Sequence, residues 1–158
     1  MKIKVGFGFD VHQLVDGHPF FMGGVHLEAK KGAFGHSDAD VLLHAICDAL
    51  LGAANLRDIG FHFSNTDNRW KGISSLVLLK ECVKMLQEKG WNVGNIDAMI
   101  CLEAPKINPH IPAMQKNIAE SIGIDVDDVS IKATTNETMG FIGRQEGVVA
   151  YAVVLINK

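Results

Sequence analysis

The chain has 158 residues, of which 47% are hydrophobic and 21% are charged, and its formal net charge is −3. This length and composition predict one globular domain with a single core, spanning residues 1–158. The weak negative charge and the absence of a basic run argue against nucleic acid as a partner. No segment approaches the roughly 18 consecutive apolar residues of a membrane span, which argues against a membrane partner.

The three cysteines, Cys47, Cys82 and Cys101, lie far apart in apolar segments and form no Cys-x-x-Cys motif. This spacing is typical of buried free thiols in a reducing compartment rather than of a disulfide framework. The first residues run directly into a strand pattern, without the apolar stretch and cleavage site of a signal peptide. We therefore expect a soluble, cytoplasmic protein.

The first two predicted strands span residues 3–9 and 20–27, and a turn signal at 16–19 lies between them. Gly6 and Gly8 lower the β-propensity of the first strand, and they indicate a bulge or the close approach of another backbone. This glycine pair is not a dinucleotide-binding fingerprint, because no helix opens directly after it.

A helix is predicted over residues 39–55, because its apolar residues recur at helical spacing and either Ser37 or Asp38 can cap its start. Residues 56–72 have no regular periodicity. An irregular segment of this length inside a compact domain is often functional.

Five further elements follow in the order helix, strand, helix, strand, strand, and they span 74–89, 93–102, 111–122, 129–135 and 148–156. The last strand is apolar on both of its faces. We therefore expect burial on both sides, by helices on one face and by another subunit on the other. The predicted fold class is α+β, a two-layer sandwich in which helices pack on one face of a single mixed β-sheet.

Two short polar patterns predict a metal site. Asp10 and His12 are two residues apart on a strand, so their side chains project from the same face. Asp40, His44 and Asp48 recur every four residues and share one helical face. The combination of Asp10, His12 and His44 suits zinc with an open fourth position, as in catalytic sites. His44 alone would more simply be a packed helix residue, so the prediction depends on the combination.

Three loops carry groups suited to phosphates. Residues 134–137 offer two hydroxyls and the carboxylate of Glu137, which could hold a hard cation such as Mg²⁺, although an ordinary polar turn is the alternative. Arg144 follows a glycine-rich turn and is either a phosphate clamp or a surface arginine. The proline-containing loop at 104–109 carries Lys106 and could present backbone groups to a planar ligand. Together these groups favour metal-assisted phosphoryl chemistry without a covalent intermediate.

Several motifs occur together in a characteristic order: Gly8-Phe9-Asp10-Val11-His12, His36-Ser37-Asp38-Ala39-Asp40, Asp58-Ile59-Gly60, Ala104-Pro105-Lys106, Lys132-Ala133-Thr134-Thr135 with Glu137, and Gly140-Phe141-Ile142-Gly143-Arg144. Through them nearly the whole chain resembles the family of 2-C-methyl-D-erythritol 2,4-cyclodiphosphate synthases. The resemblance implies a cyclising phosphorus–oxygen lyase of the non-mevalonate isoprenoid pathway. Its substrate would be 4-diphosphocytidyl-2-C-methyl-D-erythritol 2-phosphate, whose 2-phosphate attacks the β-phosphorus and releases CMP.

The resemblance also implies two cofactors and two catalytic residues. Zn²⁺ would be held by the cluster of Asp10, His12 and His44, and Mg²⁺ or Mn²⁺ would be anchored by Glu137. Transition-state stabilisation is implied for the residues at two matched positions, His36 and Thr135.

Substrate contacts are implied at the remaining matched positions, with Asp48 as an additional candidate. The segment from Leu102 to Asn108, together with Thr134 and Thr135, matches the family's cytidine pocket. The full set comprises Asp10, Val11, His12, His36, Ser37, Asp58, Ile59, Gly60, Phe63, Ser64, Asn65, Thr66, Asp67, Leu102, Glu103, Ala104, Pro105, Lys106, Ile107, Asn108, Thr134, Thr135, Asn136, Glu137, Phe141 and Arg144.

A homotrimer is also implied, in which the cytidine pocket comes from the neighbouring subunit and each active site spans an interface. Phe9, Arg144 and Glu146 match residues near the trimer axis. Members of the family can enclose there a cavity able to hold an isoprenoid diphosphate.

One departure from the family pattern concerns the segment Ser64-Asn65-Thr66-Asp67, where the family commonly has Pro-Asp-Thr-Asp. The missing proline leaves the loop freer before substrate binds, and the missing carboxylate changes a substrate hydrogen bond. We expect a looser lid and a raised KM. Two other functions stay open at this point: a zinc-dependent phosphohydrolase, and a non-catalytic trimeric module that binds nucleotides.

Overall fold

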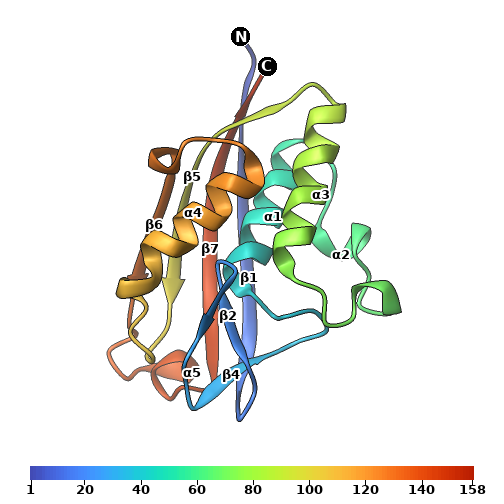
Figure 1. Cartoon of the computed structure of the whole chain (residues 1–158). Helices are drawn as coiled ribbons and strands as arrows, with labels where there is room; N and C mark the ends of the chain where they lie inside the picture. Colours follow the sequence, from blue (N-terminus) through green and yellow to red (C-terminus); the bar gives the residue numbers. More distant parts are fainter.

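The structure is a computed structural model that describes residues 1–158. The chain folds around a mixed five-stranded sheet (Figure 1). Its strand order is β4-β1-β7-β5-β6, where β5 and β6 are parallel and all other neighbours are antiparallel. The strands are β1 (Ile3–Asp16), β4 (Lys31–Phe34), β5 (Asn92–Cys101), β6 (Val129–Thr134) and β7 (Gly147–Asn157). The longest pairing joins β1 to β7, from Ile3 opposite Asn157 to Gln13 opposite Gly147.

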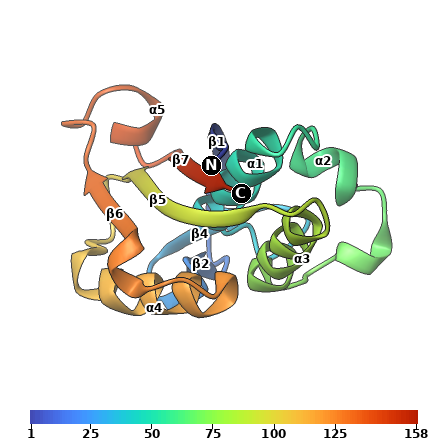
Figure 2. The same ribbon diagram turned by 90° about the horizontal axis from the view of Figure 1, so that it is seen from above.

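Three long helices cover the sheet: α1 (Val41–Ala53), α3 (Ser75–Glu88) and α4 (Ile111–Ile122). Helix α1 packs against β1 and β7, and α3 and α4 lie side by side on one side of β5 (Figure 2). Four shorter helical segments are α2 (Ile59–His62), η1 (Asn68–Trp70), η2 (Asn108–His110) and η3 (Val126–Asp128), and a fifth is α5 (Gly140–Gly143). None of the helices is both long and apolar enough to cross a membrane. The arrangement confirms the predicted α+β sandwich.

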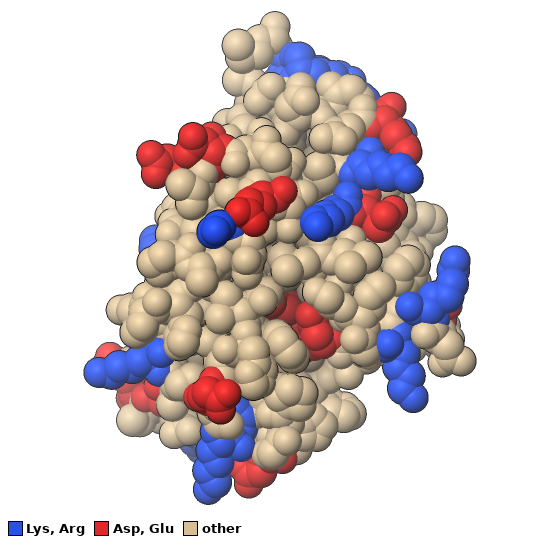
Figure 3. All heavy atoms as spheres, in the orientation of Figure 1, with Lys and Arg blue, Asp and Glu red and all other residues tan.

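One hydrophobic cluster of 39 buried residues fills the space between the sheet and the helices. Strand β7 contributes alternate residues to it, and Ala150, Val154 and Ile156 are each no more than 1% exposed. On the front of the molecule, acidic and basic side chains are interspersed over α3 and α4 (Figure 3). These helices therefore have an apolar inner side and a charged outer side, as amphipathic helices in a two-layer fold require.

The other face of the sheet is covered within the chain only beside α5, where Val149 of β7 is 2% exposed. It displays apolar side chains of β1 and β7 that are at least a third exposed: Ile3, Val5, Phe7, Phe9, Val11, Tyr151 and Val153. We call these seven residues the bare apolar face. Within the single chain, most of the second face of β7 is therefore exposed, whereas its composition predicted burial on both faces.

The start of α1 corrects one sequence-based expectation. Asp40 is the N-cap, because its Oδ1 accepts from Leu43 N–H at 3.1 Å, and neither Ser37 nor Asp38 caps the helix. The Asp40 carboxylate also accepts from the N–H groups of Gly23 at 3.0 Å and Gly24 at 2.7 Å. Asp40 is thus fully buried, and it serves as the helix cap at the start of the helical face that it was predicted to share with His44 and Asp48.

The N-terminal strands also differ from the prediction. Strand β1 continues to Asp16, well beyond the predicted end at residue 9, because it gains β4 as a second partner. Residues 20–27 form two paired strands, β2 (Phe20–Met22) and β3 (Val25–Leu27), since Gly23 and Gly24 turn the chain with φ of +57° and +73°. Strand β4 was not predicted at all.

Gly8 is predicted to be irreplaceable for stability. A Cβ atom on Gly8 would lie 1.9 Å from the Ala45 carbonyl oxygen on α1, so Gly8→Ala forces the helix away from the strand. We expect a cost of about 1–3 kcal/mol or more, measured by urea unfolding. Gly52→Ala is the matched control, because Gly52 is exposed on α1 with nothing within 4 Å of its Cβ position and should gain up to about 1 kcal/mol. Equal stability of the Gly8→Ala and unaltered proteins would contradict this prediction.

Candidate metal centre and nucleotide pocket

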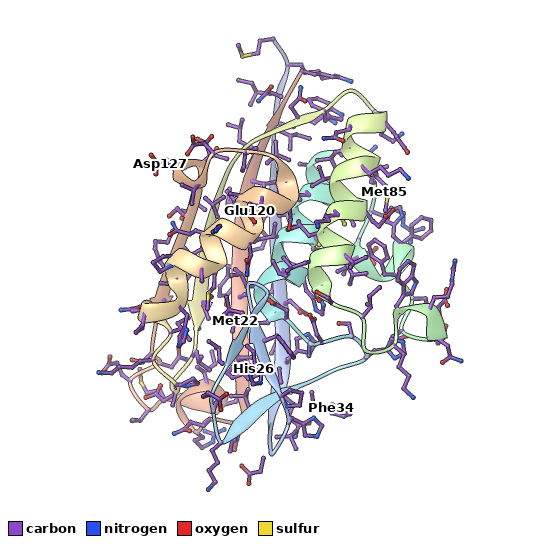
Figure 4. The ribbon with its side chains drawn as sticks, in the orientation of Figure 1. Met22, His26, Phe34, Met85, Glu120 and Asp127 are labelled. Atoms are coloured by element: carbon purple, nitrogen blue, oxygen red, sulfur yellow. The ribbon has the colours of Figure 1, made fainter.

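Asp10, His12 and His44 converge where β1 faces α1. Asp10 Oδ2 lies 3.0 Å from His12 Nε2 and 3.0 Å from His44 Nδ1, and the two nitrogens are 3.1 Å apart. The far nitrogen of His12, Nδ1, donates to the carbonyl oxygen of Phe34 at 3.0 Å. Phe34 is the last residue of β4, and Figure 4 labels it. The structure thus brings together the three residues that the sequence predicted as ligands, and each offers one atom to a common point.

The donor set fits a tetrahedral metal ion. Zinc bonds of 2.0–2.1 Å place neighbouring ligand atoms about 3.3–3.4 Å apart, close to the spacing found here. One carboxylate oxygen and two imidazole nitrogens leave a fourth position for another ligand. This cluster is the only group of three or more histidine, cysteine or acidic side chains with such convergent geometry.

Electrostatics within the cluster favour positive charge between Asp10 and the two rings, whether a proton or a metal ion supplies it. Burial opposes ionisation of Asp10, but its hydrogen bonds to His12 and His44 outweigh burial and lower its pKa to about 2. Burial likewise opposes protonation of His12, and the contacts with Asp10 outweigh it and raise the pKa of His12. At neutral pH the carboxylate is therefore ionised and concentrates negative charge beside both rings.

The cluster lies in a pocket of about 390 Å³ between α1, α2 and the segment that follows α2. His36 belongs to the same pocket, and its Nε2 lies 3.2 Å from the carbonyl oxygen of Asp67. The other lining residues are Gly35, Ser37, Ile59, Gly60, Phe63, Asn65, Trp70 and Leu78. Six of the predicted substrate contacts, His36, Ser37, Ile59, Gly60, Phe63 and Asn65, therefore share one cavity with the metal cluster.

Two aspartates fix the start of α2 at the rim of this pocket. Asp58 caps α2 by accepting from Phe61 N–H at 3.2 Å, and Asp48 on α1 accepts from Ile59 N–H at 3.1 Å. Burial is the main reason that the pKa of Asp48 is raised, and the charges of Asp58 and Asp10 add to it, despite the opposing hydrogen bond from Ile59. Helix α2 is thereby anchored to α1, which explains regular structure within the segment predicted to be irregular.

A second pocket, of about 240 Å³, lies at the far edge of the sheet beside β6. Glu103 organises its rim, because its carboxylate accepts from Asn136 N–H at 3.1 Å and from Thr138 N–H at 3.2 Å. In the same loop, the hydroxyl of Thr135 donates to Glu137 Oε1 at 3.1 Å. The lining residues are Leu102, Glu103, Pro105, Lys106, Ile107, Asn108, Ala133, Thr134 and Thr135.

The two pockets do not meet within one chain. They share no lining residue, and β7 and β5 separate β1 from β6 in the sheet. With strands about 4.8 Å apart, β1 and β6 lie about 14 Å from each other. The remaining predicted contacts line neither pocket: Val11, Asp58, Ser64, Thr66, Asp67, Ala104, Asn136, Glu137, Phe141 and Arg144.

Sequence reasoning missed three residues that line the metal pocket, Gly35, Trp70 and Leu78, and a fourth, Ser75, that lies behind it. Trp70 lines the pocket from η1, and its ring packs edge-on against Phe63 at a centroid distance of 5.1 Å. Ser75 is completely buried, and its Oγ lies 2.8 Å from His44 Nε2. Beside Ser74, Ser75 resembles any serine at a helix start, so no local signal in the sequence distinguishes it.

The fold and the site together define the class of protein: an α+β sandwich that carries a carboxylate–histidine–histidine cluster between β1 and α1. The chain belongs to the YgbB family, whose sequence pattern matches residues 3–157. It is 65% identical over 158 residues to the 2-C-methyl-D-erythritol 2,4-cyclodiphosphate synthase of Cytophaga hutchinsonii, covering 100% of this chain and 99% of that protein. It is 63% identical to the synthase of the same name from Bacteroides fragilis, with the same coverage.

Solved structures agree with these relatives. A structure of 2C-methyl-D-erythritol-2,4-cyclodiphosphate synthase in a CDP-bound form superposes with a TM-score of 0.90 at 33% identity, covering 98% of this chain and 100% of that one. The bifunctional IspDF from Campylobacter jejuni superposes with a TM-score of 0.94 at 40% identity, and there the match covers 98% of this chain but only 42% of the other. The family predicted from the sequence motifs is confirmed.

Asp48→Asn is predicted to stabilise the protein at neutral pH. The amide oxygen still accepts from Ile59 N–H, whereas the disfavoured charge is removed. Because the pKa of Asp48 is raised on folding, the unaltered protein loses stability as pH rises through that pKa, and the variant does not. Its Tm at pH 7 should be higher by a few degrees at most.

Below the ordinary aspartate pKa of 3.8, Asp48 is protonated in both the folded and unfolded states, so the difference in Tm should vanish. Calorimetry at both pH values measures it. Asp127→Asn, at an exposed position, controls for the loss of one negative charge. An equal or lower Tm for Asp48→Asn at pH 7 would contradict the prediction.

Proposed function

We propose that this protein converts 4-diphosphocytidyl-2-C-methyl-D-erythritol 2-phosphate to 2-C-methyl-D-erythritol 2,4-cyclodiphosphate and CMP, in the non-mevalonate pathway to isoprenoids. The observation that carries the proposal is the convergent Asp10, His12 and His44 cluster within an open pocket. Relatives that match the full length of this chain at 57–65% identity are named as synthases of that product. We assign residues 1–158 to one catalytic domain and place the protein in the cytoplasm.

The reaction needs positioning and charge neutralisation rather than a covalent intermediate. The 2-phosphate oxygen forms a bond to the β-phosphorus while the bond from that phosphorus to the CMP oxygen breaks, so no water is consumed. Zn²⁺ held by Asp10, His12 and His44, and Mg²⁺ or Mn²⁺ anchored by Glu137, would supply charge neutralisation to the phosphates when bound. His36 at the wall of the metal pocket and Thr135 beside Glu137 are assigned to stabilising the transition state.

The substrate contacts divide between the two pockets. Ser37, Asp58 and Gly60 are assigned to the methylerythritol phosphate, with Asp48 anchoring the α2 segment. The pocket from Leu102 to Asn108, with Thr134 and Thr135, is assigned to cytidine, and a CDP-bound neighbour of the same fold supports a nucleotide ligand. Phe141 and Arg144 are assigned as further substrate contacts, and Arg144 is assigned also to the axis of the assembly.

A homotrimer completes the site in this proposal. The metal pocket adjoins β1 and the nucleotide pocket adjoins the edge strand β6, so no single chain can hold both ends of one substrate. A cyclic assembly places one edge of each subunit against the opposite edge of the next, and it also buries the bare apolar face around the axis. Phe9, Arg144 and Glu146 are assigned to that axis, where an isoprenoid diphosphate is the proposed ligand.

The activity is tested by ³¹P NMR of the purified protein with the diphosphocytidyl substrate and Mg²⁺, with and without a zinc-selective chelator. We expect two coupled cyclic-diphosphate resonances together with CMP, and their loss after chelation. Asp10→Ala should abolish turnover, with Asp16→Ala on the same strand as the control. Free phosphate or an acyclic product would instead identify a zinc-dependent phosphohydrolase. Unchanged substrate with bound nucleotide would identify a non-catalytic nucleotide-binding module.

Shared active sites predict complementation between two inactive variants. Asp10→Ala damages only the metal half of a site, and Glu137→Gln damages only the nucleotide half. In trimers mixed from equal amounts of both, about a quarter of the sites combine two intact halves, so about a quarter of the activity should return. Sedimentation measures assembly in parallel. Mixed trimers without activity would show that each site lies within one chain.

Asn65→Asp is predicted to lower KM by restoring a charged hydrogen-bond acceptor in the metal pocket. We expect a change of about two- to tenfold with little change in kcat, which corresponds to one hydrogen bond. Steady-state kinetics measures both constants. Ser64→Pro, the other departure from the family pattern, separates loop stiffness from the lost carboxylate. An unchanged or raised KM for Asn65→Asp would refute the expected effect.

A further inference from the structure

The ring of His44 is held on the side that faces away from the metal cluster. Its Nδ1 faces Asp10 and His12, whereas its Nε2 lies 2.8 Å from Ser75 Oγ and 3.1 Å from Ser37 Oγ. Ser75 is fully buried, whereas Ser37 lines the pocket. The two serines therefore differ, since only Ser75 lies where neither solvent nor substrate reaches.

Asp38 determines the direction of the hydrogen bond between Ser75 and His44. Its carboxylate accepts twice from Ser75, at 2.5 Å from the hydroxyl and at 2.8 Å from the backbone N–H. Because an ionised carboxylate can only accept, the Ser75 hydroxyl hydrogen points toward Asp38. The Ser75 oxygen is then left to accept from His44 Nε2–H.

This direction assigns the tautomer of His44. With a proton held on Nε2, Nδ1 is the nitrogen that can give up its proton and offer a lone pair to a metal ion beside Asp10 and His12, as a metal ligand requires. His12 has the opposite arrangement, because its Nδ1–H donates to the Phe34 carbonyl and leaves Nε2 free. Each ring thus has its far nitrogen engaged as a donor.

The fold anchors Asp38 and Ser75 firmly enough for this task. The segment around Asp38 pairs with the start of α3, because Asp38 N–H donates to Ile73 O at 3.0 Å and Gly72 N–H donates to His36 O at 2.9 Å. Asp38 Oδ1 also accepts from Asp40 N–H at 3.2 Å, next to the cap of α1. The hydrogen-bonded residues Asp38 and Ser75 therefore join the start of α1 to the start of α3 directly behind His44.

We propose that Asp38 and Ser75 are positioning residues that set the tautomer and orientation of His44 for metal binding. The inference rests on the proposed metal site, and it adds two residues that act through His44 without touching the ion. Partners of this kind, which hold the far nitrogen of a histidine ligand, typically change metal affinity 10- to 100-fold.

The test compares two adjacent serines at the start of α3. Ser75→Ala removes the acceptor for His44 Nε2–H, whereas Ser74→Ala removes only the helix cap, which accepts from Leu76 N–H at 3.3 Å. Zn²⁺ affinity of the full chain is measured by competition with a chromophoric chelator. We expect at least a tenfold loss for Ser75→Ala and less than a twofold loss for Ser74→Ala. In the Ser75→Ala background, Asp38→Asn should add less than twofold, because Asp38 acts through Ser75.

Zn²⁺ binding by Ser75→Ala as tight as in the unaltered protein would overturn the inference while leaving the metal site intact. If the unaltered protein binds no Zn²⁺, or binds it equally well after Asp10→Ala, the proposed metal site itself fails and this inference fails with it. Should Ser75→Ala not fold, ¹⁵N NMR of the unaltered zinc-loaded protein decides. A His44 proton on Nε2 supports the inference, and a proton on Nδ1 overturns it.

Discussion

The close packing of helix α1 on strand β1 is the constraint on which the metal cluster depends. The carbonyl oxygens of Ala45 and Ala49 lie where a Cβ atom of Gly8 or Gly6 would be, so the helix approaches the strand at backbone distance. This approach brings His44 within hydrogen-bonding reach of Asp10, which lies two residues beyond Gly8 on the same face of β1. Bulkier residues on that strand would separate the ligands by more than any bond to a metal allows.

Buried polar groups at the start of α1 hold this packing in one register. Burial is the main cause of the raised pKa of Asp40, although three backbone N–H groups stabilise its charge. Asp38 next to it holds Ser75, and through Ser75 it holds His44. No buried side-chain nitrogen or oxygen lacks a hydrogen-bond partner, so the polar groups behind the cluster form a fully satisfied network. Networks of this kind rigidify the site that they support.

The same sheet that assembles the metal cluster also keeps the nucleotide pocket away from it. Antiparallel pairing through β7 places β1 and β5 on either side of that strand, and the α4 crossover then adds β6 at the outer edge. The bare apolar face lies on the side without helices. Under the proposed function, a single chain has two half-sites and one unsatisfied surface, and the proposed closed assembly of identical chains would satisfy both requirements at once.

The sequence by itself determined the fold class, the three long helices and the three metal-site residues. Helical and strand periodicity are local, and spacings of two and four residues place side chains on one face without any tertiary information. Only the tertiary structure decided that Asp40 caps α1, that β4 joins the sheet and that Ser75 lies behind His44. These features depend on contacts between segments more than 15 residues apart, such as Asp40 with Gly23 and Ser75 with Asp38. A serine that supports a metal ligand and one that merely starts a helix have the same local sequence signal, and burial by distant elements is what distinguishes them.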